Sequence, residues 1–362
     1  MSGSWAWLKR NGSWLRYVVG IGLGALALWA VSGQRAELSD ATRELGHLNL
    51  AWLFIGIAAE ALSIVAFAQM QGRLLASGDA YMPPLRMVAM TTAAGAIASS
   101  LPAGPAVSSV FAYRQYRRYG ADEALAAWTL IAALVSSALG LSILATAGLV
   151  LAERQGAAFD LVGVTVGVFI VTLVATAVLW QRRTLSRFGL VSLRVLRRLT
   201  GRPRRHEAEV IAGVMSRLGR VQLGWRDFGS VLGWSVVNWS LDCGCLACGF
   251  LAVHAGIPWR GLLLAYGAAQ LASNLPVTPG GLGVVEGSLM IALVAYGGGL
   301  ASTVGAVLLY RIVSFWGYLP VGWLTYVGIV MSDRRENRAA DEAAVLEPAT
   351  GAVAMPAEDL GR

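Results

Sequence analysis

Three ionisable side chains stand inside long apolar runs of this sequence, where they could hold a charged ligand. Glu286 follows a stretch of prolines and glycines, Arg311 lies in the apolar run 301–331, and Asp242 lies in the run 228–253. Charges inside such runs are costly in a bilayer, and they are usually paired or functional. We expect Glu286 and Arg311 to bind a ligand or to form a purely structural ion pair. Asp242, with Glu60 and Asn238, could equally bond only a neighbouring helix.

The stretch that positions Glu286 cannot be a continuous helix. Residues 274–286 read Asn-Leu-Pro-Val-Thr-Pro-Gly-Gly-Leu-Gly-Val-Val-Glu, and apolar sequence flanks them on both sides. Each proline removes a backbone donor and clashes with the preceding turn, while the glycines free the backbone. A broken backbone at membrane depth is tolerated where it lines a polar cavity or is buried in protein, so this break is a candidate binding site.

A similar stretch occurs earlier in the chain, displaced by 174 residues (258 minus 84). Four residues of the first stretch match four of the second: Pro84, Arg86, Pro102 and Pro105 match Pro258, Arg260, Pro276 and Pro279. Paired prolines and arginines at equal distances are rarely coincidental in a chain dominated by alanine and leucine. The match predicts an internal duplication.

The composition is that of a membrane protein. The chain is 56% hydrophobic and 14% charged, with a mean hydropathy of +0.60. Its formal charge of +8 does not indicate nucleic acid, because the arginines stand in short blocks between apolar runs. Cys243, Cys245 and Cys248 share one apolar run without a histidine at ligand spacing, so we expect small residues that ease helix contact, not a metal site or a disulfide.

The arginine blocks give the topology. Residues 181–226 contain twelve arginines and are predicted to be cytoplasmic by the positive-inside rule. Part of this segment has one basic and one apolar helical face, which fits a helix on the anionic leaflet or an ordinary solvated connector. The regions are a cytoplasmic N-terminus (1–16), a membrane half with the first repeat (17–180), a basic cytoplasmic connector (181–226), a membrane half with the second repeat (227–331) and a disordered cytoplasmic tail (332–362).

We therefore predict an all-α polytopic membrane protein: an inverted repeat with two broken or re-entrant helical hairpins and about six full spans. The predicted spans are 17–33, 50–71, 123–151, 161–180, 228–253 and 301–331, and the hairpins are 85–113 and 259–296. If the hairpin limbs cross completely, the count becomes about eight to ten crossings. The first hairpin starts and ends among arginines and the second among few, so the two enter from opposite sides. Both chain termini are then cytoplasmic, in a cytoplasmic (inner) cell membrane.

The predicted binding residues surround the two breaks. Half-helices that end there expose amides and a favourable dipole to an anion such as a lipid phosphate, although the breaks could instead only shape packing. The candidate substrate-binding residues are Ser99, Pro102, Pro105, Asn274, Pro276, Thr278, Pro279, Gly280, Gly281, Gly283, Glu286, Arg311 and Asp242.

Residues 276–286, followed by Leu309-Tyr310-Arg311, resemble the lysylphosphatidylglycerol synthase transmembrane family over roughly residues 15–332. The resemblance implies a flippase-like membrane protein, with characteristic positions at Pro276, Pro279, Gly280, Gly281, Gly283, Glu286 and Arg311. We expect a stand-alone member without the aminoacyltransferase domain, so lysyl transfer is not implied. The first break reads Pro-Ala-Gly-Pro from residue 102 and lacks the charges common in relatives, so no particular lipid cargo is implied either.

These features predict a lipid flippase-like transporter that moves a lipid or a lipid-linked amphiphile between leaflets. The alternative is an accessory or scaffold protein that binds envelope lipids or a lipid synthase without transport. We expect no enzyme activity, cofactor or metal, since we find no phosphate-binding loop, HExxH or GxSxG sequence. The expected partners are membrane lipids and, on the alternative, a lipid synthase. A homo-oligomer is compatible with the sequence, and no nucleic acid is expected.

Overall fold

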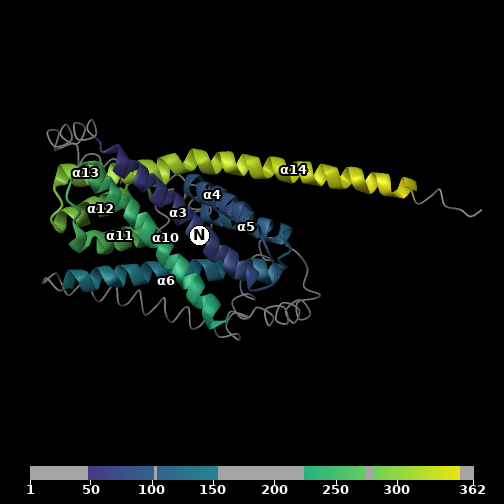
Figure 1. Cartoon of the computed structure of the whole chain (residues 1–362), viewed down its shortest axis with the longest axis horizontal. Coiled ribbons are helices and arrows are strands. Elements are labelled where there is room, and N and C mark those ends of the chain that lie inside the picture. Colours follow the sequence, from purple (N-terminus) through teal and green to yellow (C-terminus); the bar gives the residue numbers. More distant parts are fainter. Residues whose placement is uncertain (1–47, 102–103, 154–223, 274–280, 351–362) are drawn as a thin grey trace, which may run out of the picture.

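The computed structural model describes residues 48–101, 104–153, 224–273 and 281–350, and these residues form helices with no strand (Figure 1). The elements are α3 (Leu50–Ala76), α4 (Pro84–Ser100), α5 (Gly104–Arg118), α6 (Glu123–Glu153), α10 (Trp225–Ala252), α11 (Trp259–Ser273), α12 (Val284–Ala295), α13 (Leu300–Arg311), the π-helix η3 (Ile312–Gly317) and α14 (Tyr318–Thr350). The predicted spans 17–33 and 161–180 and the connector 181–226 lie outside the described residues.

Four segments are long and apolar enough to cross a bilayer: Leu50–Ala76, Glu123–Leu151, Trp225–Ala252 and Leu300–Ala339. They correspond to four of the predicted spans. In the most apolar window of α3 only 17% of the residues are buried, and large side chains such as Phe54 and Leu62 lie on its surface. In water such a surface would be unstable, so α3 fits a hydrocarbon environment. The protein is an all-α membrane protein.

Between the long helices lie two pairs of short ones. Each pair, α4 with α5 and α11 with α12, is interrupted where the sequence predicts a break. Their lengths of 17, 15, 15 and 12 residues correspond to at most about 26 Å, less than the hydrocarbon core of about 30 Å. At the first break Gly104 donates its amide to the Leu101 carbonyl (2.8 Å). A side chain at Gly104 would strike the Ala98 carbonyl, which explains the glycine.

Both outer ends of the first pair lie against α14. Arg86 at the start of α4 and Arg118 at the end of α5 bind the Glu336 carboxylate, at 3.0 and 3.3 Å. Arg118 also pairs with Asp333, and Ser332 donates to Glu336. We call these five residues the α14 clasp. Its Ser332 hydroxyl and two arginines hold the pKa of Glu336 below its usual value. Since one carboxylate binds both outer ends, α4 and α5 form a hairpin.

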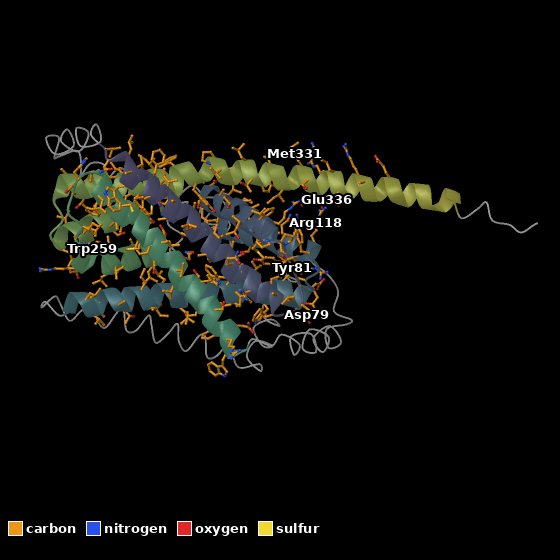
Figure 2. The ribbon with its side chains drawn as sticks, viewed as in Figure 1. Asp79, Tyr81, Arg118, Trp259, Met331 and Glu336 are labelled. Carbon is orange, nitrogen blue, oxygen red and sulfur yellow. The ribbon has the colours of Figure 1, made fainter. Side chains whose placement is uncertain are left out.

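The second pair is also a hairpin, and it opens at the opposite end of the bundle. Gly261, near the start of α11, lies directly against the Tyr296 ring at the end of α12. In Figure 2, Trp259 at the start of α11 lies at one end of the bundle, whereas Arg118 and Glu336 lie toward the other. The two hairpins therefore enter the bundle from opposite ends.

The hairpin of each half packs on a long helix of the other half. The central contact joins α3 to α10, while α4 packs on α14 and α11 packs on α6. Two glycines permit the outer contacts. A Cβ on Gly148 of α6 would lie 2.7 Å from the Leu264 amide nitrogen of α11, and one on Gly322 of α14 would lie 2.8 Å from the Thr92 carbonyl oxygen of α4. Residues 148 and 322 are separated by the same 174 positions as the matched prolines.

Helix boundaries also follow this displacement. The starts of α10 and α3 differ by 175 residues (225 minus 50), those of α11 and α4 by 175 (259 minus 84), and those of α13 and α6 by 177 (300 minus 123). Two regions of the chain thus fold into the same series of elements: a long helix, a hairpin, and a second long helical segment.

The end of the chain differs from the prediction. We expected the last span to stop at residue 331 and a disordered tail to begin at 332, but α14 continues to Thr350 (Figure 1). Residues 332–346 are rich in Ala, Arg and Glu, which favour helix. The α14 clasp also fixes the first turns beyond residue 331. Only residues 351–362 of the predicted tail lie outside the described structure.

Candidate functional site

A polar network lies among α10, α11 and α13 inside the bundle. Its centre is the Asp242 carboxylate, which accepts hydrogen bonds from the Tyr266 hydroxyl at Oδ2 (2.6 Å) and the Tyr310 hydroxyl at Oδ1 (2.9 Å). The Gln270 amide donates to the Tyr310 hydroxyl (3.1 Å) and more weakly to Asp242 (3.4 Å). Tyr266 and Tyr310 are fully buried. Donors from two other helices thus surround one carboxylate within the apolar run of α10.

Glu60 approaches the same carboxylate from α3, in the other half of the chain. The carboxyl groups of Glu60 and Asp242 are close enough to share a hydrogen bond. Within the described part of the chain, Oε2 of Glu60 is buried and has no hydrogen-bond donor beside it. Two carboxyl groups can bond to each other only if one of them carries a proton. The network therefore reaches across the central contact between α3 and α10.

An ion pair lies beside this network. Nε of Arg311 is 2.6 Å from Oε1 of Glu286, and the two side chains are 9% and 17% exposed. The guanidinium carbon also lies 4.5 Å from the centre of the Phe315 ring, which adds a cation–π contact. The chain thus forms the pair that was one of the two sequence expectations for Glu286 and Arg311.

The second break fixes the Glu286 side chain. Gly281 and Gly283 have φ angles of +68° and +81°, in the left-handed region that favours glycine. This turn starts α12 at Val284, and the Gly283 amide donates to Oε2 of Glu286 (2.7 Å). Each carboxylate oxygen of Glu286 thus has its own partner: the backbone of the break and Arg311.

The other partner of the pair is positioned by an irregular turn. Arg311 is the last residue of α13, and the π-helix η3 begins with the next residue. Single π-turns inside α-helices are frequent at functional sites because they redirect the side chains that follow. Here the turn separates Arg311, which faces α12, from Tyr318, which donates to the Thr92 carbonyl of α4 at 2.9 Å.

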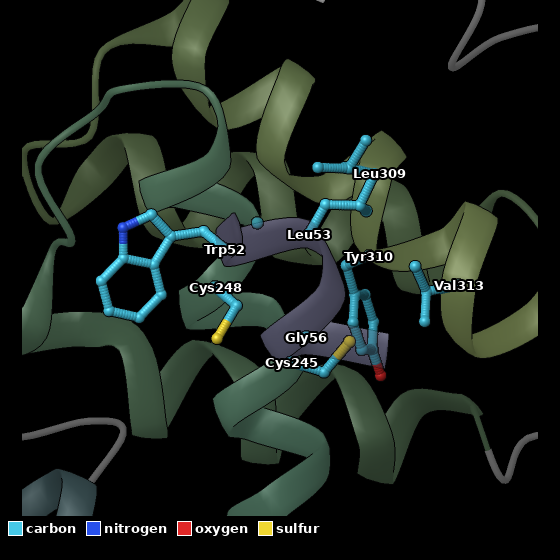
Figure 3. A pocket seen from close by; sticks show the side chains of 9 residues that line it. Trp52, Leu53, Gly56, Cys245, Cys248, Leu309, Tyr310 and Val313 are labelled. Carbon is cyan, nitrogen blue, oxygen red and sulfur yellow. The ribbon is translucent and has the colours of Figure 1, made fainter. Parts of the chain in front are cut away.

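A shallow apolar groove adjoins the network (Figure 3). Trp52 and Gly56 of α3, Cys245 and Cys248 of α10, and Tyr310 of α13 line it. Tyr310 therefore has two neighbourhoods: its ring borders the groove, and its hydroxyl donates to Asp242. An apolar surface beside buried polar groups is chemically suited to an amphiphile.

The structure brings some predicted residues together and leaves others apart. Glu286, Arg311, Gly281, Gly283 and Asp242 all belong to the region just described. By contrast, Ser99 and Pro105 lie at the first break, where the Trp323 indole donates to the hydroxyl of Ser100, not of Ser99. Six predicted residues lie outside the described structure: Pro102, Asn274, Pro276, Thr278, Pro279 and Gly280.

Sequence reasoning missed Tyr266, Gln270 and Tyr310. Tyr266 and Gln270 are four residues apart, so they share one face of α11, and this spacing of two polar side chains in an apolar run was a usable signal. Tyr310 precedes Arg311 directly. The three cysteines are buried thiols, and no group of potential metal ligands occurs among the described residues.

Comparison with known proteins gives a family match. A model described as the lysylphosphatidylglycerol synthase TM region matches residues 17–322. The matched range includes both hairpins, the Asp242 network and the Arg311 ion pair. No curated protein matches the chain.

Proposed function

The chain belongs to the lysylphosphatidylglycerol synthase TM region family, and on this premise we propose that it is a flippase-like transporter. It moves a lipid, or a lipid-linked amphiphile, between the two leaflets of the cell membrane. It does so without catalysing a reaction and without a bound cofactor.

The observation that carries this proposal is the cost of the buried polar network. Asp242, Glu60, Glu286 and Arg311 all lie in apolar helices, where each charge is expensive. Replacing a buried ion pair by packed apolar residues is often neutral or stabilising, so stability alone explains such a cluster poorly. Polar groups beside an apolar groove at the second break could hold a head group while acyl chains remain in the lipid.

The arrangement of the two halves supports a transport mechanism. Hairpins that enter from opposite ends, with long helices packed across the halves, are what an inverted repeat produces. In such transporters the site lies near the bilayer midplane, at the repeat interface, where helices are broken. We propose that α4–α5 and α11–α12 are re-entrant hairpins, that two further spans complete a set of about six, and that both chain termini are cytoplasmic.

The test is lipid movement in liposomes that contain the purified protein. Fluorescent analogues of the main envelope lipid classes are offered in one leaflet, and their accessibility to an external quencher is followed. We expect Arg311→Ala to abolish most of the acceleration. The matched control is Arg335→Ala, an exposed arginine of α14, which is expected to retain it.

Two results would count against transport. Liposomes with folded wild-type protein could show no faster movement for any lipid class, or both arginine variants could behave alike. If, in addition, the protein retains a lipid synthase through detergent purification, the scaffold alternative becomes the better account.

A further inference from the structure

We propose that Glu60 and Asp242 form a proton-binding site that joins the two halves of the protein, and that release of this proton is coupled to lipid movement. The binding site stands on the geometry of the two carboxyl groups. Its coupling to transport rests on the function proposed above. The site supplies an energy source for a chain in which the sequence indicates no nucleotide-binding loop.

The hydrogen-bond donors locate the proton. Asp242 accepts from two tyrosine hydroxyls, Tyr266 at 2.6 Å and Tyr310 at 2.9 Å, so its oxygens are occupied as acceptors. Glu60 has no donor at its buried Oε2. A hydrogen bond between the two carboxyl groups therefore has Glu60 as donor and Asp242 as acceptor. This assignment leaves Asp242 charged and Glu60 neutral.

The local charges make one proton the natural number. Arg311 is bonded to Glu286 at 2.6 Å, and this pair is close to neutral. If Glu60 and Asp242 were both ionised, two negative charges would face each other at hydrogen-bond distance, and carboxylates that share a site resist this. With one proton, the pair carries a single charge that Tyr266, Tyr310 and the nearby Arg311 stabilise.

Every helix packed against Glu60 contributes to this balance. The titratable or charged neighbours of the pair are Cys243 and Cys245 on α10, Tyr266 on α11, Tyr310 and Arg311 on α13 and Tyr318 on α14. α4 and α6 also contact α3, but their charged residues, Arg86, Glu123 and Glu153, stand at or near the helix ends. Arg311 is thus the cation that balances the site.

The position of the site gives the proton a mechanical effect. α3 and α10 make the central contact between the halves, and the Glu60–Asp242 hydrogen bond crosses it. When the proton leaves to water, the O–H bond of Glu60 breaks, its electron pair stays on the carboxylate, and both groups are negative. The attraction across the contact becomes repulsion, which favours movement of one half against the other.

Infrared spectroscopy of the full-length protein in lipid tests the binding site directly. Raising the pH should remove the carbonyl band of a protonated carboxylic acid from the wild-type spectrum. Glu60→Gln should lack this band, because the amide keeps a donor toward Asp242 but has no acidic proton. The control Glu123→Gln, at an exposed position at the start of α6, should keep it. A titrating acid band that persists in Glu60→Gln overturns the site.

Lipid movement under a pH difference tests the coupling. In proteoliposomes with unequal internal and external pH, one proton per lipid allows a leaflet ratio of up to about tenfold per pH unit. Glu60→Gln should reduce this ratio to about one, while Glu123→Gln should not. If wild-type protein moves lipid at a ratio independent of pH, the coupling is wrong and the proposed transport stands. If no lipid moves although the acid band behaves as expected, the transport proposal fails and the proton site stands.

Discussion

The ion pair between Arg311 and Glu286 permits a quantitative prediction. The change is Arg311→Met, which preserves much of the side-chain volume and removes the charge. It leaves the Glu286 carboxylate, 17% exposed, with the Gly283 amide as its remaining partner from the site described here. It also removes the cation–π contact with Phe315.

These losses give the expected magnitude. Removing one partner of a buried pair costs about 3–5 kcal/mol, because the other charge is left uncompensated. Glu286 keeps one hydrogen bond and some solvent, so we expect the lower end, about 3 kcal/mol. Adding Glu286→Gln removes the stranded charge, while its amide oxygen can still accept from Gly283. The double variant should therefore recover about 2 kcal/mol, within the range known for interacting residues.

The chain contains its own reporter for this experiment. Its three cysteines, Cys243, Cys245 and Cys248, are all buried in α10. A dye that fluoresces on reaction with thiols will therefore follow unfolding in detergent, as a function of temperature or denaturant. The control is Arg335→Met, whose exposed position should keep its effect within about 0.5 kcal/mol.

One result would refute the reasoning. If Arg311→Met and Glu286→Gln change the free energy of unfolding additively, within about 0.5 kcal/mol, the two side chains do not interact appreciably. The pair would then be neither a structural support nor a preorganised site in the folded protein.

Three further predictions concern the break, the helix contacts and the clasp. Gly283→Ala, at φ +81°, should lower the free energy of unfolding by about 1–2 kcal/mol in the cysteine assay, whereas Gly287→Ala, in open space within α12, should be neutral or slightly stabilising; equal effects would show that the turn is not required. Gly322→Leu should separate α14 from α4 and abolish lipid movement in liposomes, while Gly328→Leu, with no neighbour within 4 Å, should not; a fully active Gly322→Leu would contradict the packing. Because the pKa of Glu336 is lowered in the fold, its bonds in the α14 clasp stabilise the protein at neutral pH and are lost as the pH falls through that lowered pKa; Glu336→Gln should remove this acid-dependent part, worth under about 1 kcal/mol at an exposed site, and an unchanged pH profile of unfolding would show that the carboxylate does not act there.

The sequence predicted the elements of the fold well, because prolines, glycines and apolar runs act locally. Hydropathy marks the four long helices, and the prolines of both stretches mark the breaks between short helices. The π-helix after Arg311 could not be predicted, since Ile312–Gly317 reads as ordinary helix and the wide turn depends on packing against neighbours. The helical continuation of α14 was missed for a related reason: Arg86 and Arg118, distant in sequence, stabilise it.

The candidate site was predicted in part. Charged residues in apolar runs are conspicuous, so Glu286, Arg311 and Asp242 could be selected from the sequence alone. Which of them meet depends on how helices pack, and packing is not local. The tyrosines around Asp242 were overlooked because aromatic residues in apolar helices are usually packing residues, and only their hydroxyl contacts distinguish Tyr266 and Tyr310.

The packing of α3 on α10 has an evolutionary consequence. If the two halves arose by duplication, equivalent helices meet at the centre, as at the twofold interface of a homodimer whose subunits later became one chain. In a homodimer every substitution appears twice, so an acidic residue at this interface would face its own copy. Fusion removes that restriction: Asp242 now has Ala68 as its counterpart 174 residues earlier, and Glu60 has Trp234. One chain can thus maintain an asymmetric centre that two identical subunits could not evolve.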